Sequence, residues 1–222
     1  MLAARARLLR VPPYERGLTL GDFFVPIGVG ERASSRQRHL ALIALGVIVM
    51  AASAQVAFRV PGTDVPVTGQ TFGVLVTATA LGFRRGVAAV GLYLILGAFL
   101  PIYAQGASGA GHIASLQGGH LVLGATGGYL VGFLVAGAVV GRLAELGWDR
   151  SYAGSISAML LGNAVVYLIG LPWLAAALGL TRDQAIAAGL TPFIAGDVVK
   201  FALAAAVFPL GWWVVGRRPS DR

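Results

Sequence analysis

Six apolar stretches, separated by short polar or charged links, run along the chain from about residue 40 almost to its end. A helix that crosses the hydrocarbon core of a bilayer needs about 20 mostly apolar residues. The first, fourth, fifth and sixth stretches reach that length comfortably. The pattern therefore predicts an all-α membrane protein, a bundle of six transmembrane helices. The stretches are Leu40–Phe58, Thr68–Leu81, Val87–Tyr103, Leu121–Val140, Ser155–Leu174 and Phe193–Val215.

The second stretch is short. It ends sharply at Gly82, which Arg84 and Arg85 follow. It reaches spanning length only if residues 65–67, Val-Pro-Val, form its outer end. Two interpretations stay open: six spanning helices, or five with a re-entrant segment.

Composition supports a lipid environment. Hydrophobic residues make up 57% of the chain and charged residues 12%, whereas a soluble domain carries about 25% charged residues. The 32 glycines fit helices that pack closely in a membrane. No cysteine is present, which excludes disulfides and thiolate metal sites. The net charge of +8 does not indicate a nucleic-acid partner, because the basic residues lie between apolar stretches and not on one face.

The distribution of basic residues predicts that both termini lie in the cytoplasm, because cytoplasmic loops are enriched in Lys and Arg. With that orientation only Arg59 and Arg182 face the exterior, and Lys200 lies within a helix. The cytoplasmic arginines are Arg5, Arg7, Arg10, Arg16, Arg32, Arg36 and Arg38 before the first stretch, and Arg84, Arg85, Arg142, Arg150, Arg217, Arg218 and Arg222 after it.

This pattern divides the chain into three parts. Residues 1–38 form a basic cytoplasmic N-terminal arm, residues 39–216 the membrane domain and residues 217–222 a cytoplasmic tail. The arm lacks the apolar core of a secretory signal. It either lies on anionic lipid through Arg5, Arg7 and Arg10, or is a disordered extension or the result of a start codon placed too far upstream.

Asp197 and Lys200 are the most informative residues for function, because both lie inside the sixth stretch. A spacing of three places them on one helix face, with Lys200 roughly 10 Å below the outer end of its helix. Ionisable groups at such depth usually face a cavity or a partner. We favour a functional site over a structural pair in which Lys200 reaches outward to water.

Four other polar residues are predicted at the same level. Gln70 begins the second helix, Gln105 follows the third, Tyr129 lies about two turns down the fourth, and Asn163 is near the middle of the fifth. Singly, such residues more often bond a neighbouring helix. Together with the charged pair they predict an outward-facing pocket. It suits a small amphipathic ligand with a carboxylate and a polar ring.

The glycine-rich segment 104–120 is predicted to be a mobile cap over this pocket. Its histidines, His112 and His120, have no accompanying carboxylate or thiol, so no metal site is expected.

On the first helix a stripe of mostly small residues has two open interpretations: packing within the bundle, or docking to another membrane subunit. The stripe consists of Ala41, Ala44, Ile48, Ala51 and Gln55.

Four segments, in this order and spacing, resemble the BioY family, the biotin-binding S components of energy-coupling factor (ECF) transporters. The resemblance runs from about residue 40 to residue 216. The segments are Val65-Pro-Val-Thr-Gly-Gln-Thr-Phe72, Leu81-Gly-Phe-Arg-Arg-Gly86, Gly124-Ala-Thr-Gly-Gly-Tyr-Leu-Val-Gly-Phe133 and Asp197-Val-Val-Lys200.

The resemblance implies high-affinity capture of biotin from outside the cytoplasmic membrane by a six-helix bundle, without a cofactor. It also implies partners: a transmembrane coupling subunit and two ATPase subunits. In the family the polar ligands correspond to Gln70, Gln105, Asp197 and Lys200. Asp197 would accept a hydrogen bond from a ureido N–H, and Lys200 would meet the ureido oxygen or hold Asp197 ionised. His112 is the candidate partner of the biotin carboxylate.

Alternatives are another vitamin, such as thiamine or riboflavin, or an intramembrane enzyme. The sequence has no serine nucleophile elbow, no His-Glu-x-x-His motif and no P-loop, so catalysis and ATP hydrolysis by this chain are not expected. A homo-oligomer remains open.

Overall fold

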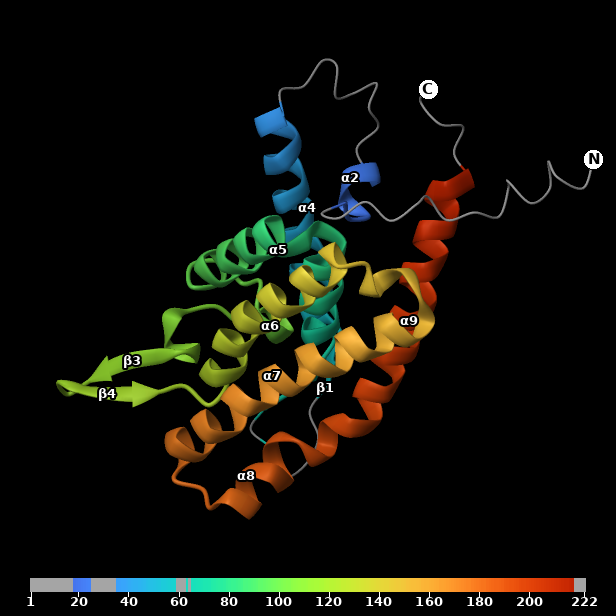
Figure 1. Cartoon of the computed structure of the whole chain (residues 1–222). Coiled ribbons are helices and arrows are strands. Elements are labelled where there is room, and N and C mark those ends of the chain that lie inside the picture. Colours follow the sequence, from blue (N-terminus) through green and yellow to red (C-terminus); the bar gives the residue numbers. More distant parts are fainter. Residues whose placement is uncertain (1–17, 25–34, 59–62, 64, 218–222) are drawn as a thin grey trace, which may run out of the picture.

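The computed structural model describes residues 18–24, 35–58, 63 and 65–217, and the elements below lie within these ranges. Helices dominate. They are α2 (Gly21–Phe24), α4 (Ser35–Gln55), α5 (Gln70–Gly97), α6 (Gly127–Glu145), α7 (Tyr152–Leu178), α8 (Arg182–Gly189) and α9 (Ile194–Arg217) (Figure 1).

Two small antiparallel hairpins and four 3₁₀ turns complete the described part of the chain. The pairs are β1 (Ala57–Phe58) with β2 (Val67–Thr68) and β3 (Ala114–Gln117) with β4 (His120–Leu123). The turns are η1 (Ala104–Gly106), η2 (Ala110–His112), η3 (Trp148–Arg150) and η4 (Thr191–Phe193).

The helices form a bundle whose outer surface is apolar. Five helical stretches of the described residues are long and apolar enough to cross a membrane. Large apolar side chains such as Ile48, Leu168 and Val198 stay exposed on their outer faces. Such a surface would be costly in water, whereas hydrocarbon solvates it without cost. The chain is built as a multi-pass membrane protein.

Helix α5 contains two of the six predicted helices, because the chain reverses within it. Gly82 adopts non-helical torsion angles, φ 80° and ψ −178°. The Nε2 atom of Gln70 lies 2.7 Å from the hydroxyl oxygen of Tyr93. In a straight helix 23 residues would separate these positions by roughly 34 Å. The two halves of α5 are therefore antiparallel, and the predicted end of the second helix at Gly82 is confirmed.

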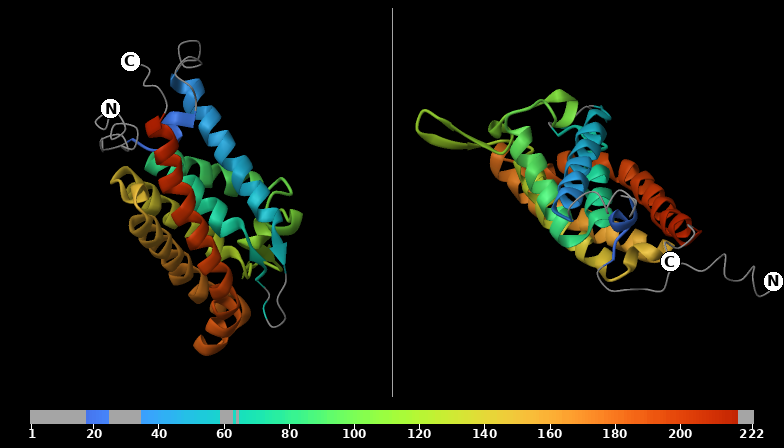
Figure 2. Two further views of the ribbon diagram at one scale, coloured as in Figure 1. Left: turned by 90° about the vertical axis from the view of Figure 1, so that its right-hand side faces the viewer. Right: turned by 90° about the horizontal axis from the view of Figure 1, so that it is seen from above.

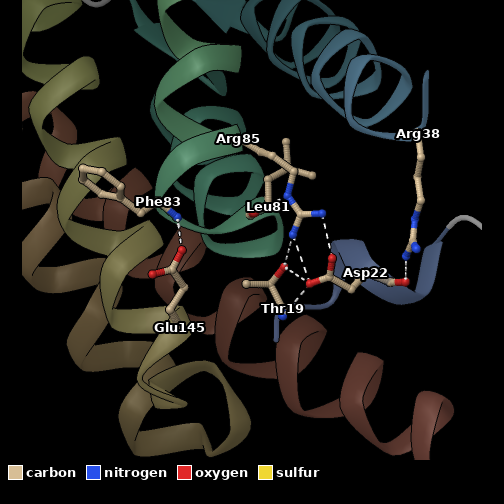
Figure 3. Close-up of polar contacts among 7 residues, drawn as sticks. All are labelled: Thr19, Asp22, Arg38, Leu81, Phe83, Arg85 and Glu145. Atoms are coloured by element: carbon tan, nitrogen blue, oxygen red, sulfur yellow. Dashed lines mark hydrogen bonds and ion pairs between the residues drawn. The ribbon is translucent and has the colours of Figure 1, made fainter. Parts of the chain in front are cut away.

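The reversal is tightly packed. A Cβ atom on Gly82 would lie 2.9 Å from Thr19 Cγ2 and 3.0 Å from Glu145 Oε1, and one on Gly141 would lie 2.8 Å from the Gly82 carbonyl carbon. The Glu145 carboxylate accepts a hydrogen bond of 2.9 Å from the backbone N–H of Phe83 (Figure 3). It thus supplies a negative charge to the start of the second half of α5.

Residues 18–24, part of the predicted N-terminal arm, pack onto this reversal (Figure 3). Arg85 donates hydrogen bonds to both carboxylate oxygens of Asp22, at 2.7 and 3.0 Å, and to the Thr19 hydroxyl at 3.0 Å. Arg38 donates to the Asp22 carbonyl, and Phe23 meets the ring of Trp212 edge-on at 5.8 Å. We call Thr19, Asp22 and Arg85 the N-terminal clamp. The predicted lipid contacts of Arg5, Arg7 and Arg10 lie outside the described residues.

A second polar contact fastens α9 at the same end of the bundle. Asp149, in η3, is fully buried and accepts a hydrogen bond of 2.8 Å from the indole N–H of Trp212. Burial raises the pKa of Asp149 to about 6, although the Trp212 hydrogen bond and the charge of Arg150 act in the opposite direction. The Arg150 guanidinium lies 4.0 Å from the centre of the Trp212 ring.

The arrangement in space follows the chain. Helix α5 packs against α4 and α6, α6 against α7, and α7 against α9. The start of α4 and the end of α9 lie at the same end of the bundle (Figures 1 and 2). The β3–β4 hairpin projects beyond the helices on another side (Figure 2).

Several predicted boundaries are wrong. The stretch Leu121–Val140 begins in β4, and its helix starts only at Gly127. Leu121 pairs with Leu116 across the hairpin, and an apolar run alone does not distinguish a strand from the start of a helix. The third helix ends at Gly97 and not at Tyr103, and the first begins at Ser35.

The small-residue stripe on the first helix packs within the bundle only at its C-terminal end, where Ala51 contacts the core and Gln55 donates a hydrogen bond to the Tyr103 carbonyl. Ala41, Ala44 and Ile48 are exposed. Packing within the bundle therefore accounts for Ala51 and Gln55, and the face of α4 around Ala41, Ala44 and Ile48 is left to lipid or to another subunit.

The reversal predicts a strict requirement for glycine. We expect Gly82→Ala to lower the free energy of unfolding by about 1–3 kcal/mol, because a side chain there is strained and crowded. Gly91→Ala is the matched control, since its Cβ would meet only Leu134, at 3.9 Å. Thermal unfolding in detergent measures both variants. Equal unfolding temperatures would contradict the assigned role.

The N-terminal clamp predicts a pH dependence of stability. Burial acts to raise the pKa of Asp22, but the hydrogen bonds and charge of Arg85, with the bonds from Thr19, outweigh it and hold this pKa below its ordinary value of 3.8. Because the folded-state pKa is lowered, the contribution is complete above the unfolded-state pKa and is lost as the pH falls through the folded-state value.

We therefore expect the unfolding temperature to fall more steeply below about pH 4 in the unchanged chain than in Asp22→Asn. At neutral pH the variant should unfold at the lower temperature. Asp183→Asn serves as the control, because Asp183 is an exposed carboxylate in α8. Its unfolding temperature should fall with pH as steeply as that of the unchanged chain. Parallel curves for the unchanged chain and Asp22→Asn would rule out the clamp as its source.

Candidate binding site

A cavity of about 390 Å³ lies where α5, α6 and α7 meet the loop after α5. Its size falls within the range of about 300–1,000 Å³ that is usual for small-molecule sites. Apolar side chains form much of the wall, among them Leu130, Phe133, Val166 and Phe193. Amide, hydroxyl and imidazole groups interrupt this wall at a few points. The cavity therefore suits a compact ligand with an apolar body and a small number of polar groups.

Four of the six predicted site residues line this cavity. Gln70 reaches it from the first turn of α5, Gln105 from η1, Tyr129 from α6 and Asn163 from the middle of α7. Tyr129 lies in the first turn of its helix and not two turns down, because α6 begins at Gly127. The structure thus brings together groups that are up to 93 positions apart in the sequence.

Asp197 and Lys200 do not line the cavity but lie directly behind its wall. The Asp197 carboxylate accepts hydrogen bonds from Asn163 Nδ2 at 2.7 Å, from the Tyr167 hydroxyl at 2.6 Å and from Lys200 Nζ at 3.0 Å. Asn163 and Tyr167 both border the cavity. The role of the charged pair as direct ligands stays a prediction.

The pair is turned inward. Asp197 is 5% exposed and the Lys200 side chain 14%, whereas the intervening Val198 is 61% exposed. A charge held away from water is tolerated only with well-placed partners, and Asp197 has three. We call Asn163, Tyr167, Asp197 and Lys200 the charged network. It links α7 and α9 beside the cavity.

A second set of hydrogen bonds holds Gln70 and the loop after α5. Gln70 donates to the hydroxyl of Tyr93, which donates to the carbonyl of Ile102 at 3.1 Å. The Tyr103 hydroxyl donates to the Leu94 carbonyl at 2.6 Å, and Gln55 donates to the Tyr103 carbonyl at 3.2 Å. These bonds fasten the base of the loop to α4 and α5.

Tyr129 joins the cavity to the segment that leads into α9. Its hydroxyl donates to the Gly189 carbonyl at 2.8 Å, and its ring stacks on that of Phe193 with centres 6.5 Å apart and an angle of 26° between the ring planes. A Cβ atom at Gly170 would lie 2.8 Å from the Tyr129 ring, so glycine is needed for this approach.

The predicted cap is only partly over the cavity. Gln105 and His112 line it, and the His112 ring meets that of Tyr103 at 5.9 Å. Gln105 adopts φ 58°, which is uncommon for a residue other than glycine. His120 lies at the exposed turn of the β3–β4 hairpin, away from the cavity. Among the described residues no group of three metal-ligating side chains occurs.

Sequence reasoning missed Tyr93, Tyr103, Tyr167 and Phe193 as site residues. Tyr167 could have been found, because it follows Asn163 by four positions and so lies on the same helix face. No local signal identifies Tyr93, whose contact with Gln70 depends on the reversal at Gly82.

Comparison with known proteins places the chain among related sequences. The "Probable biotin transporter BioY" of Pyrococcus horikoshii is 34% identical over 174 residues, which cover 78% of this chain and 94% of that protein. The "Biotin transporter BioY" of Thermotoga maritima is 34% identical over 149 residues, 67% of this chain and 81% of that protein.

A solved structure shares the fold. It is described as the "S-component for biotin from an ECF-type ABC transporter", and it matches with a TM-score of 0.66 and 23% identity over 86% of this chain and 95% of that one. The model of the BioY family matches residues 30–217. The chain belongs to the BioY family.

Proposed function

We propose that this chain captures biotin from outside the cell and serves as the substrate-binding subunit of an ECF-type uptake system. One observation carries the proposal: a cavity of ligand size has amide groups in its wall and a buried ion pair directly behind it. The relatives that carry the name biotin transporter, and the family to which the chain belongs, support this ligand. Proteins of this family transport and do not catalyse.

Biotin has the chemistry that this cavity suits. Its ureido ring offers two N–H donors and one carbonyl acceptor, its thioether ring and aliphatic tail are apolar, and the tail ends in a carboxylate. Burial of the apolar part contributes roughly 25 cal/mol per Å², and each charge-assisted hydrogen bond about 1.5–3 kcal/mol.

We assign the ureido ring to the deep side of the cavity, between Gln70 and Asn163. These two amides come from different helices, and Asp197 with Lys200 lies behind the second of them. Tyr129 and Phe193 supply aromatic surface for the rings. The carboxylate then lies toward the loop, where Gln105 and His112 line the opening.

The orientation and the partners are further parts of the proposal. The arginine distribution supports cytoplasmic termini, which places the cavity loop outside. As an ECF S component the chain works with other subunits, and we assign to them a transmembrane coupling protein and two ATPases. The exposed face of α4, with Ala41 and Ala44, is available to such a subunit or to lipid.

The charged network predicts a loss of affinity when either charge is removed. We expect Asp197→Asn and Lys200→Ala to weaken biotin binding by roughly 10- to 100-fold, the equivalent of one charge-assisted hydrogen bond. Isothermal titration calorimetry on detergent-purified protein measures this, and Asp183→Asn should retain the original affinity. Unchanged affinity in both variants, with unchanged unfolding temperatures, would show that the charged network does not contribute to biotin binding.

The ligand itself is tested by competition. Purified chain should bind labelled biotin saturably without ATP, because the cavity is already formed in the isolated subunit. Unlabelled biotin should displace the label, whereas excess thiamine or riboflavin should not. Displacement by either of these vitamins, or the absence of saturable binding, would contradict the assignment to biotin.

A further inference from the structure

Tyr93 is fully buried and does not line the cavity, yet it contacts a residue that does. Its hydroxyl donates to the backbone carbonyl of Ile102 at 3.1 Å and lies 2.7 Å from Gln70 Nε2. A phenol has one proton, and a carbonyl oxygen can only accept. The hydroxyl is therefore an acceptor toward Gln70, and the Gln70 atom that faces it must be the amide nitrogen.

This contact leaves the Gln70 carbonyl oxygen for the cavity. An amide side chain offers two donors on nitrogen and one acceptor oxygen, and rotation by half a turn exchanges their places. The Tyr93 hydroxyl removes that freedom, because an oxygen placed against it would find no proton. Gln70 itself is 6% exposed, so contact with water contributes little to the orientation of its side-chain amide.

The part of the cavity wall that Asn163 forms follows the same rule. The Asp197 carboxylate is paired with Lys200, and an ionised carboxylate can only accept, so Asn163 must turn its nitrogen toward it. Tyr167 likewise uses its one proton on Asp197. The amides of Gln70 and Asn163 thus both turn their oxygens away from their protein partners.

We propose that Tyr93 is a positioning residue that fixes Gln70 as a hydrogen-bond acceptor, so that this part of the cavity selects a ligand by its N–H donors. The inference rests on the proposed function, because the ureido ring of biotin presents two N–H groups. Gln70 on α5 and Asn163 on α7 then each accept from one of them. A ligand with an acceptor in place of an N–H meets an oxygen and is rejected.

The test compares biotin with its two cyclic carbamate analogues, in each of which one ureido N–H is replaced by an oxygen atom. For each protein, calorimetry gives two ratios, each of which is the dissociation constant of one analogue divided by that of biotin. In Tyr93→Phe we expect biotin to bind roughly tenfold more weakly. With the hydroxyl gone, Gln70 can rotate and donate to the ring oxygen of one analogue. The ratio for that analogue should fall at least threefold.

Tyr103→Phe is the matched control. It also removes a hydroxyl that donates to a backbone carbonyl in the same region, but that hydroxyl has no contact with Gln70. Whatever affinity it loses, it should keep the ratios of the unchanged chain. A second variant, Gln70→Met, leaves Tyr93 in place and removes the fixed oxygen, and it should lower the same ratio.

The outcomes separate the two claims. If the unchanged chain binds biotin but both ratios stay the same in a folded Tyr93→Phe, Tyr93 does not set the orientation of the Gln70 amide. If Tyr93→Phe does not fold, Gln70→Met still tests whether the Gln70 oxygen is the acceptor, and unchanged ratios in that variant contradict the proposal. If the unchanged chain binds no biotin, the proposed function itself is wrong.

Discussion

The reversal of the chain at Gly82 is the constraint on which the cavity depends. It turns one long apolar stretch into two antiparallel halves, which pack closely enough that a Cβ on Gly86 would lie 2.9 Å from Ala78 Cα. At one end of these two antiparallel halves, the turn places Arg85 in an ion pair with Asp22. At the other end the same two halves bring Gln70 to Tyr93. A positive φ at a single glycine therefore organises both ends of the bundle.

Lipid restricts the hydrogen-bond partners of the polar residues in the bundle. Hydrocarbon offers no hydrogen bonds, so each polar group must bond to another protein group. Two sets of such groups border the cavity, one around Gln70 and Tyr93, the other around Asn163 and Asp197. The bonds that make these groups tolerable also decide which atoms face the cavity. Under the proposed function, the contacts that stabilise these groups in the membrane also orient the atoms that meet the ligand.

The two ends of the bundle are built differently. At the end of the N-terminal clamp, the contacts of Asp22 with Arg85 and of Asp149 with Trp212 join segments far apart in the sequence. At the cavity end the connections are loops and a projecting hairpin, held at their base by Tyr103 and Gln55. A receptor that admits a ligand from one side needs the other end of its bundle to be held closed, and the contacts of Asp22 and Asp149 supply this.

The sequence by itself determined the membrane class, the six helical segments, the break at Gly82 and the pairing of Asp197 with Lys200. These depend on local hydrophobicity and on residues a few positions apart, which lipid and the helical repeat translate directly into structure. Only the tertiary structure decided that Leu121 joins a hairpin, that residues 18–24 pack onto the reversal, and that Asp197 lies behind Asn163. Each of those features depends on contacts between segments that are far apart in the sequence. Such contacts cannot be predicted from the residues of one segment alone.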